Sequence, residues 1–356
     1  MRFSQRGEDI RKFILEHVEK HPNDIAKLTA EHFGISRQAV SKQLRRLTNE
    51  EKLLTETGET RKRAYKLAIL VEWRKFYKID AALEEHVLWD QDVSLVLQPL
   101  PQNVMDIWHY GFTEMLNNAK DHSGGNSIFV RVTKTAITTE MMIADDGIGI
   151  FKKIQEAFNL PDQRYAILEL AKGKLTTDPT RHTGEGIFFS SRMFDQFSVG
   201  ADKVWYGHRF GDDEYDWISD EWGHQGTSVF LELRNHATRT AEKIFDQFAS
   251  PDGDYSFNKT CVPVKLAQYG NDKLISRSQA KRVVTRLELF KTIMLDFTHV
   301  PSIGQAFADE IFRVFANEHP ELTIIPINAN SEVKRMIARA KQPPVPVEIP
   351  VIPYES

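Results

Sequence analysis

The chain is organised around residues 114–149, which read EMLNNAKDHSGGNSIFVRVTKTAITTEMMIADDGIG. The stretch begins with a carboxylate and a carboxamide four residues apart, Glu114 and Asn118, inside a predicted helix over residues 106–120. Residues four apart lie on one face of a helix, so these two side chains are neighbours. One of them can orient a water or hydroxyl, while the other ligates Mg²⁺, which prefers hard oxygen ligands.

The same stretch ends in an apolar run followed by an acidic glycine turn. Residues 141–144, Met-Met-Ile-Ala, predict a strand that delivers Asp145 to its end. A carboxylate in that position can accept a hydrogen bond from the exocyclic amine of a purine. Gly147 and Gly149 permit a close approach of the backbone to a ligand, because glycine has no Cβ.

Two further glycine motifs follow along the chain. Thr183-Gly184-Glu185-Gly186 directly precedes a predicted helix over 187–194, and Gly226-Thr227-Ser228 closes the set. A helix start presents free N–H groups and a positive dipole end to phosphate. The ordered motifs therefore predict Mg·ATP as the ligand. The competing interpretation is a hairpin turn and helix-terminal glycines that bind nothing.

Together these motifs resemble those of the GHKL ATPases, which include gyrase, Hsp90-type chaperones, histidine kinases and MutL. Residues 114–119 match the N box of that family, 145–149 its first glycine box, 183–186 its second and 226–229 its terminal strand motif. The resemblance covers roughly residues 101–236 and implies a two-layer α+β Bergerat sandwich of helices on a mixed sheet.

The resemblance also implies roles for individual residues. Glu114 corresponds to the general base, Asn118 to the Mg²⁺ ligand and Asp145 to the adenine contact. The remaining cofactor-binding positions are Gly147, Gly149, Thr183, Gly184, Gly186 and Thr227. Residues 168–180, which include Lys172, Gly173 and Lys174, are a candidate nucleotide lid, and a solvated loop is the alternative.

Composition and length bound the class of protein. A chain of 356 residues predicts two or three domains, and 41% hydrophobic with 27% charged residues suits ordinary packed cores. The single cysteine, Cys261, excludes an internal disulfide framework and a Cys-based zinc cluster. No apolar segment follows Met1-Arg2-Phe3, and no run has the length of a membrane span. We therefore expect a cytoplasmic protein without a membrane partner.

Charge is distributed unevenly along the chain. Residues 1–68 hold 15 Lys and Arg against 10 Asp and Glu, whereas the remainder holds 31 against 40. A basic N-terminal segment on an acidic body indicates contact with nucleic acid at that segment.

The basic segment has the pattern of three helices. We predict them over 8–20, 25–33 and 37–49, with Gly34 ending the second and Ser36 capping the third. Two helices joined by a short glycine turn form a helix-turn-helix. The residue types on the outer face of the third helix suit base edges and phosphates: Ser36, Arg37, Gln38, Ser41, Lys42, Arg45 and Arg46.

A short hairpin follows these helices. Residues 53–55 pair plausibly with 64–67 across a tip that contains Arg61, Lys62 and Arg63. Residues 25–67 resemble the winged helix-turn-helix of bacterial transcriptional regulators, which implies DNA binding and often a homodimer that reads paired half-sites. A winged helix used only for protein contacts is the alternative. Phosphate contacts would make DNA affinity strongly salt-dependent.

The connection to the central region lacks a phosphoacceptor. Residues 80–90 are amphipathic, and residues 95–97 are predicted to be extended. A phospho-accepting histidine would precede an acidic residue, but His86 precedes Val87 and His109 precedes Tyr110. A histidine kinase is therefore disfavoured.

The C-terminal region alternates strands and helices, which predicts a small α/β layer. The strands are expected over 262–266, 292–297 and 322–327, and the helices over 278–289, 304–317 and 331–339. Residues 293–315 resemble STAS domains, which implies a protein partner. Ser302 is the candidate phosphorylation site, and capping of the following helix is its alternative role. The resulting domain boundaries are 1–68, 69–100 (helical connector), 101–238, 239–255 (linker), 256–340 and 341–356 (Pro-rich tail).

Two functions from different classes fit this organisation. The first is a transcriptional regulator in which Mg·ATP binding modulates DNA binding. The second is an enzyme, a GHKL-type protein Ser/Thr kinase or ATPase acting on a STAS-like or other partner. Glu114 permits hydrolysis but does not require it.

Overall fold

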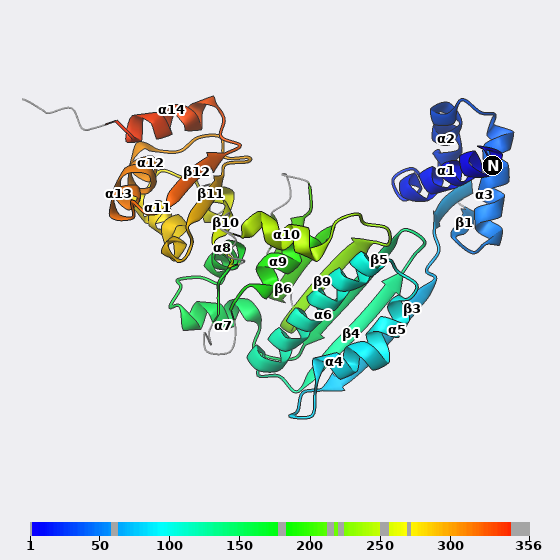
Figure 1. Cartoon of the computed structure of the whole chain (residues 1–356), viewed down its shortest axis with the longest axis horizontal. Helices are drawn as coiled ribbons and strands as arrows, with labels where there is room; N and C mark the ends of the chain where they lie inside the picture. The colour runs from blue at the N-terminus through cyan, green and yellow to red at the C-terminus, as the bar shows by residue number, and fades with distance from the viewer. Residues whose placement is uncertain are drawn as a thin grey trace, which may run out of the picture. The chain divides into compact units, whose positions relative to one another are not determined.

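The computed structural model describes residues 2–57, 63–176, 183–211, 217–219, 224–249, 256–268 and 272–342. The chain divides into two compact units, one made of residues 1–163 and 179–244 and the other of 164–178 and 245–356 (Figure 1). It is a multidomain protein of helices and several sheets, as predicted.

The N-terminal part of the first unit contains three helices and a two-stranded antiparallel sheet. These are α1 (Arg2–His17), α2 (Ile25–Phe33), α3 (Arg37–Asn49), β1 (Leu53–Thr57) and β2 (Arg63–Leu67). The helices form because apolar residues at helical spacing, among them Ile14, Val40 and Leu44, are buried together. Gly34 ends α2 in the left-handed region at φ 60°, and the Ser36 Oγ accepts a hydrogen bond from Ala39 N at 3.2 Å.

A seven-stranded sheet forms the centre of the first unit. Its strands, in spatial order, are β3 (Val71–Lys78), β4 (Ser127–Lys134), β5 (Thr138–Asp145), β9 (His224–Arg234), β6 (Gln196–Asp202), β7 (Val204–Arg209) and β8 (Trp217–Ser219). All of these neighbours pair antiparallel, so the expectation of a mixed sheet is wrong for the described strands. The reason is the position of β9, which returns between β5 and β6 and runs opposite to both.

Helices cover one face of this sheet. The central helix α6 (Gln102–His122) packs against β4, β5 and β9, and Figure 1 shows it lying along the sheet. Next to it, α9 (Gly186–Met193) packs against β6 and β7, and α7 (Ile150–Ala157) against β6. Gly111 allows α6 to approach α9 closely, because a Cβ there would lie 2.4 Å from the Phe194 ring.

The segment expected to be a helical connector belongs partly to the sheet. β3 follows β2 after only residues 68–70 and pairs with β4 along its whole length. Residues 94–97 are helical, so the expected extended conformation there is wrong. The helices of the segment are α4 (Glu85–Leu88), the π-helix η1 (Trp89–Val93) and α5 (Ser94–Leu97), and all three pack on α6. The expected linker contains a further helix, α10 (Ala241–Phe248).

The second unit has a parallel three-stranded sheet, in the order β10 (Lys259–Pro263), β11 (Thr292–Asp296) and β12 (Thr323–Ile327). Its helical elements are α8 (Arg164–Lys172), η2 (Val264–Ala267), α11 (Arg277–Val284), η3 (Leu287–Leu289), α12 (Gln305–Asp309), η4 (Glu310–Phe315), α13 (Ala316–Glu318) and α14 (Ser331–Ala340). The predicted α/β layer is therefore confirmed, although residues 264–266, expected in a strand, form the 3-10 helix η2, and the helix expected to reach residue 289 ends at Val284. One helix, α8, comes from far outside the predicted C-terminal domain.

Candidate functional site

Glu114 meets the second glycine turn at the start of α9. It lies on α6, and a Cβ built on Gly186 would stand 2.1 Å from its Oε2 atom. Any side chain at position 186 would therefore displace the carboxylate. Two motifs separated by about 70 residues in sequence are in direct contact.

Asp145 connects the first glycine turn to the terminal strand motif. Its Oδ1 accepts hydrogen bonds from Gly147 N at 2.9 Å and from Thr227 N at 3.2 Å. The Thr227 hydroxyl in turn accepts from Ile150 N at 3.0 Å. Gly226, at φ 84°, permits this arrangement, because a Cβ there would lie 1.9 Å from the Asp145 carbonyl oxygen. The aspartate is thus a fixed acceptor at the end of β5.

The end of α6 is joined to the first glycine turn. Ile148 N donates to Ser123 O at 3.0 Å, and a Cβ on Gly147 would lie 2.2 Å from that same oxygen. Lys153 Nζ of α7 donates to His122 O at 2.6 Å. The structure thus gives Gly147 a packing reason for having no side chain, beside the expected approach to a ligand. The sequence motifs are therefore joined in two pairs, Glu114 with Gly186 and Asp145 with Thr227, and the first glycine turn also contacts the end of α6 through Ser123.

Half-buried acidic groups give this site its electrostatic character. Burial raises the pKa of Glu114, and the negative charge of Glu185 raises it further. Burial also raises the pKa of the Tyr110 hydroxyl, and the charges of Glu114 and Glu185 add to that shift. Burial also raises the pKa of Asp145, although its hydrogen bonds with Gly147 and Thr227 oppose the shift. A carboxylate with a raised pKa is better suited to exchange protons near neutral pH.

The raised pKa of Glu114 predicts how stability depends on pH. The folded carboxyl keeps its proton to higher pH than the unfolded one, so its contribution to the unfolding free energy is full below about pH 4.5 and is lost as the pH rises. We expect Glu114→Gln to be more stable than wild type at pH 7, with the difference shrinking toward pH 5. Urea unfolding followed by Trp fluorescence measures this. Asp106→Asn, at an exposed position of the same helix, is the control. A difference that stays constant with pH contradicts the prediction.

Asn118, the predicted Mg²⁺ ligand, lies on α6 one turn beyond Glu114. Among the described residues, no group of three or more His, Cys, Asp or Glu side chains could hold a metal ion alone. The role of Asn118 as a Mg²⁺ ligand stays a prediction.

Sequence reasoning missed two residues near Glu114, and two of the predicted residues make no described contact with the carboxylates of the site. Glu185 and Tyr110 belong to the electrostatics of the site. Tyr110 could have been found because it lies four residues before Glu114 on the same helix. Thr183 is exposed, and Gly184 has φ 71°, but no described hydrogen bond ties either residue to Glu114 or Asp145.

Residues 168–172, the first part of the candidate lid, form neither a nucleotide lid nor a solvated loop. These residues end α8, which belongs to the second unit, and all five are buried. Lys172 is 0% exposed and donates to Glu169, so it is neither a phosphate-facing lysine nor part of a solvated loop. Lys174 Nζ donates to Leu289 O at 2.9 Å in the same unit. Apolar residues at helical spacing outweigh the signal of the glycine and threonines that follow.

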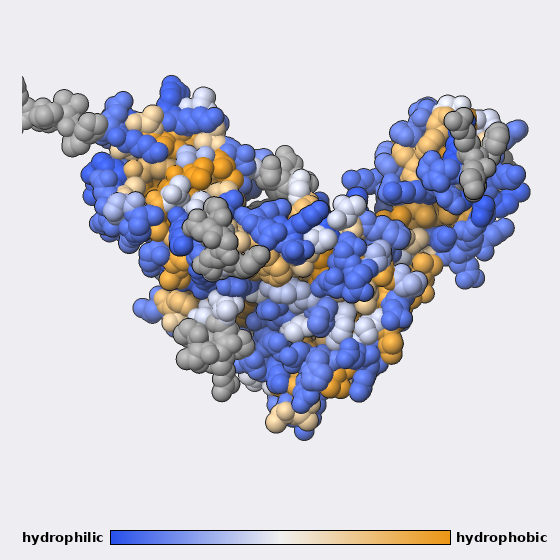
Figure 2. All heavy atoms as spheres, viewed as in Figure 1, coloured by the Kyte–Doolittle hydropathy of each residue, from blue (hydrophilic) through white to orange (hydrophobic). Residues whose placement is uncertain are grey.

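A second candidate site is the outer face of α3. All seven predicted contact residues on the helix and its cap are exposed: Ser36, Arg37, Gln38, Ser41, Lys42, Arg45 and Arg46. Arg46 Nε pairs with Glu50 Oε1 at 2.8 Å, and this interaction, together with that of Lys52, lowers the pKa of Glu50 to about 2. Arg63 is exposed in β2, whereas Arg61 and Lys62 lie outside the described residues. Hydrophilic side chains predominate on the visible surface of α1, α2 and α3 (Figure 2).

Ser302 does not cap the helix that follows it. The N-cap of α12 is Gly304, and no side chain accepts a hydrogen bond there, so the alternative capping role is wrong. Ile303, between the two, is buried and bridges to Leu274. Ser302 is half-buried, and its phosphorylation stays a prediction.

Comparison with known proteins identifies part of the second unit. Residues 279–334 match the family described as a STAS-like domain of unknown function (DUF4325). The match runs from α11 into α14 and confirms the STAS-like part of the predicted C-terminal domain. No curated protein matches the chain significantly. Within the described residues, no helix combines the length and the apolar character that crossing a membrane requires.

Proposed function

We propose that this protein is a cytoplasmic, ATP-binding transcriptional regulator with a GHKL-type module and a winged helix, in which Mg·ATP modulates DNA binding. The observation that carries the proposal is that motifs far apart in sequence are in contact in pairs, two of them through α6. Glu114 contacts Gly186, and Asp145 binds the backbone of Thr227, although these residues are far apart in sequence. A shared ligand gives these contacts a common purpose, whereas the competing interpretation explains each of them separately by packing.

The arrangement of α3 and β3 supports a DNA-binding output. The cationic face of α3 is exposed, and only three residues separate β2 from β3, an edge strand of the central sheet. A short connection of this kind transmits a displacement of the sheet to the helices before it. If ATP and DNA favour the same arrangement, each raises the affinity for the other.

Calorimetry and gel shifts test the proposal directly. The protein should bind ATP in the presence of Mg²⁺, and it should shift random-sequence duplex DNA with an affinity that nucleotide changes. Absence of nucleotide binding by a folded sample would remove the GHKL assignment. A nucleotide effect on duplex affinity in wild type that persists in a variant unable to bind ATP would exclude the regulatory role.

The DNA-binding face gives a prediction that depends on a single ion pair. Arg45 has no described ionic partner, whereas Arg46 is engaged by Glu50, so Arg45→Ala should weaken duplex binding more than Arg46→Ala. Loss of one phosphate contact should reduce the slope of log affinity against log salt by about one. Fluorescence anisotropy over a salt series measures this. Lys12→Ala, an exposed lysine of α1, is the control. Equal effects of all three substitutions contradict the assignment of α3.

A kinase or ATPase is the second candidate, and the half-buried carboxylate Glu114 favours it. Burial raises the pKa of Glu114 toward the range of a general base. Labelled γ-phosphate that appears on this chain or a partner, and disappears in Glu114→Ala, would support phosphate transfer.

A further inference from the structure

Helix α8 belongs to the second unit, although its sequence lies between the two glycine turns of the candidate nucleotide site. The helix packs against β10 and η2, and most of its length is buried. Before it, residues up to Gln163 belong to the first unit, and after it the chain returns to that unit at residue 179. The second unit therefore includes a segment whose sequence lies within the first unit, between the two glycine turns.

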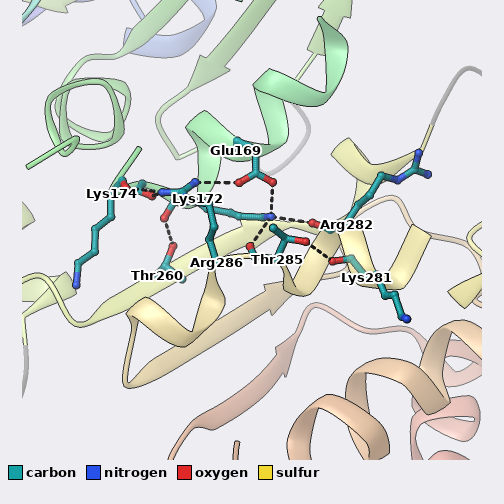
Figure 3. Close-up of polar contacts among 9 residues, drawn as sticks. Glu169, Lys172, Lys174, Thr260, Lys281, Arg282, Thr285 and Arg286 are labelled. Atoms are coloured by element: carbon teal, nitrogen blue, oxygen red, sulfur yellow. Dashed lines mark hydrogen bonds and ion pairs between the residues drawn. The ribbon is translucent and has the colours of Figure 1, made fainter. Parts of the chain in front are cut away.

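A buried lysine fixes α8 to the end of α11. Lys172 is 0% exposed, and its Nζ donates to Glu169 Oε1 at 2.6 Å, to Arg282 O at 2.7 Å and to Thr285 O at 2.9 Å (Figure 3). The two carbonyls lie at the C-terminal end of α11, where backbone acceptors lack helical partners and the dipole favours a cation. All three donor positions of the ammonium group are thus used.

Further contacts hold the same end of α8 from two other elements. Glu169 Oε2 accepts from Arg286 Nη1 at 2.8 Å, and Arg286 also donates to the carbonyl oxygens of Gly173 and Lys174. Thr260 Oγ1 of β10 donates to Lys172 O at 2.6 Å. Withdrawing α8 would leave buried charges without partners, which is costly. The helix therefore stays with the second unit when either unit moves.

The chain on both sides of α8 leads directly to the candidate nucleotide site. Gly149 caps α7, and only residues 158–163 separate α7 from α8. On the other side, ten residues separate Gly173 from Gly184. Because an extended chain spans at most about 3.5 Å per residue, both connections limit how far α8 and the two glycine turns can separate.

We propose that α8 couples nucleotide binding to the STAS-like unit. Nucleotide bound at the two glycine turns changes the position that α8 and its unit prefer. By reciprocity, a change in that position alters the affinity for nucleotide. The proposal rests on the nucleotide-binding function proposed above and names how that site is regulated. A partner that binds the STAS-like unit would, through α8, change nucleotide affinity.

Hydrogen exchange of the full chain tests the coupling without a variant. We expect Mg²⁺ with a non-hydrolysable ATP analogue to change exchange in peptides covering 145–149 and 184–186, and also in those covering 164–174 and 282–289. Changes confined to the glycine turns overturn the coupling but leave nucleotide binding intact. If calorimetry shows no binding of the analogue, the proposed nucleotide function itself fails.

A substitution in the anchor tests the reciprocal direction. The double variant Glu169→Gln/Lys172→Met should change the Kd for the analogue by about fivefold or more, the lower range of typical allosteric coupling. Lys281→Met, which replaces a 69% exposed lysine of α11, should leave the Kd unchanged. A folded double variant with wild-type affinity overturns the proposal. If the double variant fails to fold, the wild-type exchange experiment still decides.

Discussion

Replacing Asp145 with Asn is expected to weaken ATP binding by about 10- to 100-fold, with the fold intact. The side chain keeps its shape, so its oxygen can still accept from Gly147 N and Thr227 N and hold the two turns together. What is lost is the charge that would accept a hydrogen bond from the adenine amine. Hydrogen bonds to charged groups contribute about 1.5–3 kcal/mol, which gives the expected range.

The neighbouring residue provides a matched control for this experiment. Asp146 is also an aspartate of the first glycine turn, but it accepts from Asn126 N at 2.6 Å and from Ser127 N at 3.0 Å. Its carboxylate therefore holds the turn before β4, and Asp146→Asn should leave the Kd for ATP within about twofold of wild type. Calorimetry with Mg·ATP compares the three proteins. Equal losses in both variants would mean that position 145 acts only through the structure of the turn.

Local signals account for the elements that were predicted correctly. The bounds of α2 and α3 follow from apolar spacing, from Gly34 in the left-handed region and from the Ser36 cap, all of which act within a few residues. The alternation of strands and helices in the second unit is equally local. Each signal lies inside the element that it defines or directly beside it, so a single sequence is sufficient.

Non-local pairing explains what was missed. The strand β3 reads as a charged segment because it is an edge strand whose side chains are mostly exposed. The insertion of β9 between β5 and β6 depends on pairing across more than 20 residues, which no local pattern encodes. At the candidate site, the order of the motifs indicated a common location, but the contribution of Glu185 to the electrostatics became visible only with α6 and α9 packed together.

The role of Lys172 could not be predicted for a related reason. A lysine beside a glycine normally indicates a solvated position, and only the packing of α8 on the end of α11 shows that this one is buried. Two of its three hydrogen-bond acceptors, the carbonyl oxygens of Arg282 and Thr285, lie more than 100 positions away in sequence.

Removing one member of the Glu169–Lys172 pair should therefore destabilise the second unit strongly. Glu169→Gln leaves a buried ammonium without its counter-charge, and breaking a buried pair in this way costs about 3–5 kcal/mol. Lys172→Met leaves the carbonyls of Arg282 and Thr285 without their donor. The double variant should lose less unfolding free energy than the two single variants together. With both charges removed, neither one is left buried without its partner.

The distribution of tryptophan separates the two units in this measurement. All six tryptophans lie between residues 73 and 222, in the first unit, so their fluorescence reports on that unit alone. In urea, the variants should unfold earlier than wild type by far-UV circular dichroism, while the fluorescence transition stays in place. Lys334→Met, which replaces an exposed lysine of α14, should match wild type in both. A fluorescence transition that shifts together with the dichroism would mean that the two units unfold as one.

The pH dependence provides an independent check on the lysine. Burial lowers the pKa of Lys172, although Glu169 opposes the shift. Between that lowered pKa and the ordinary lysine value of 10.5, the unfolded chain binds more protons than the folded one, so the unfolding free energy of the second unit rises with pH. Lys172→Met should remove this alkaline rise, whereas Lys281→Met should retain it. If the unfolding free energy of Lys172→Met rises with pH as steeply as that of wild type, another group releases the proton. Lys172 would then stay charged over the whole range.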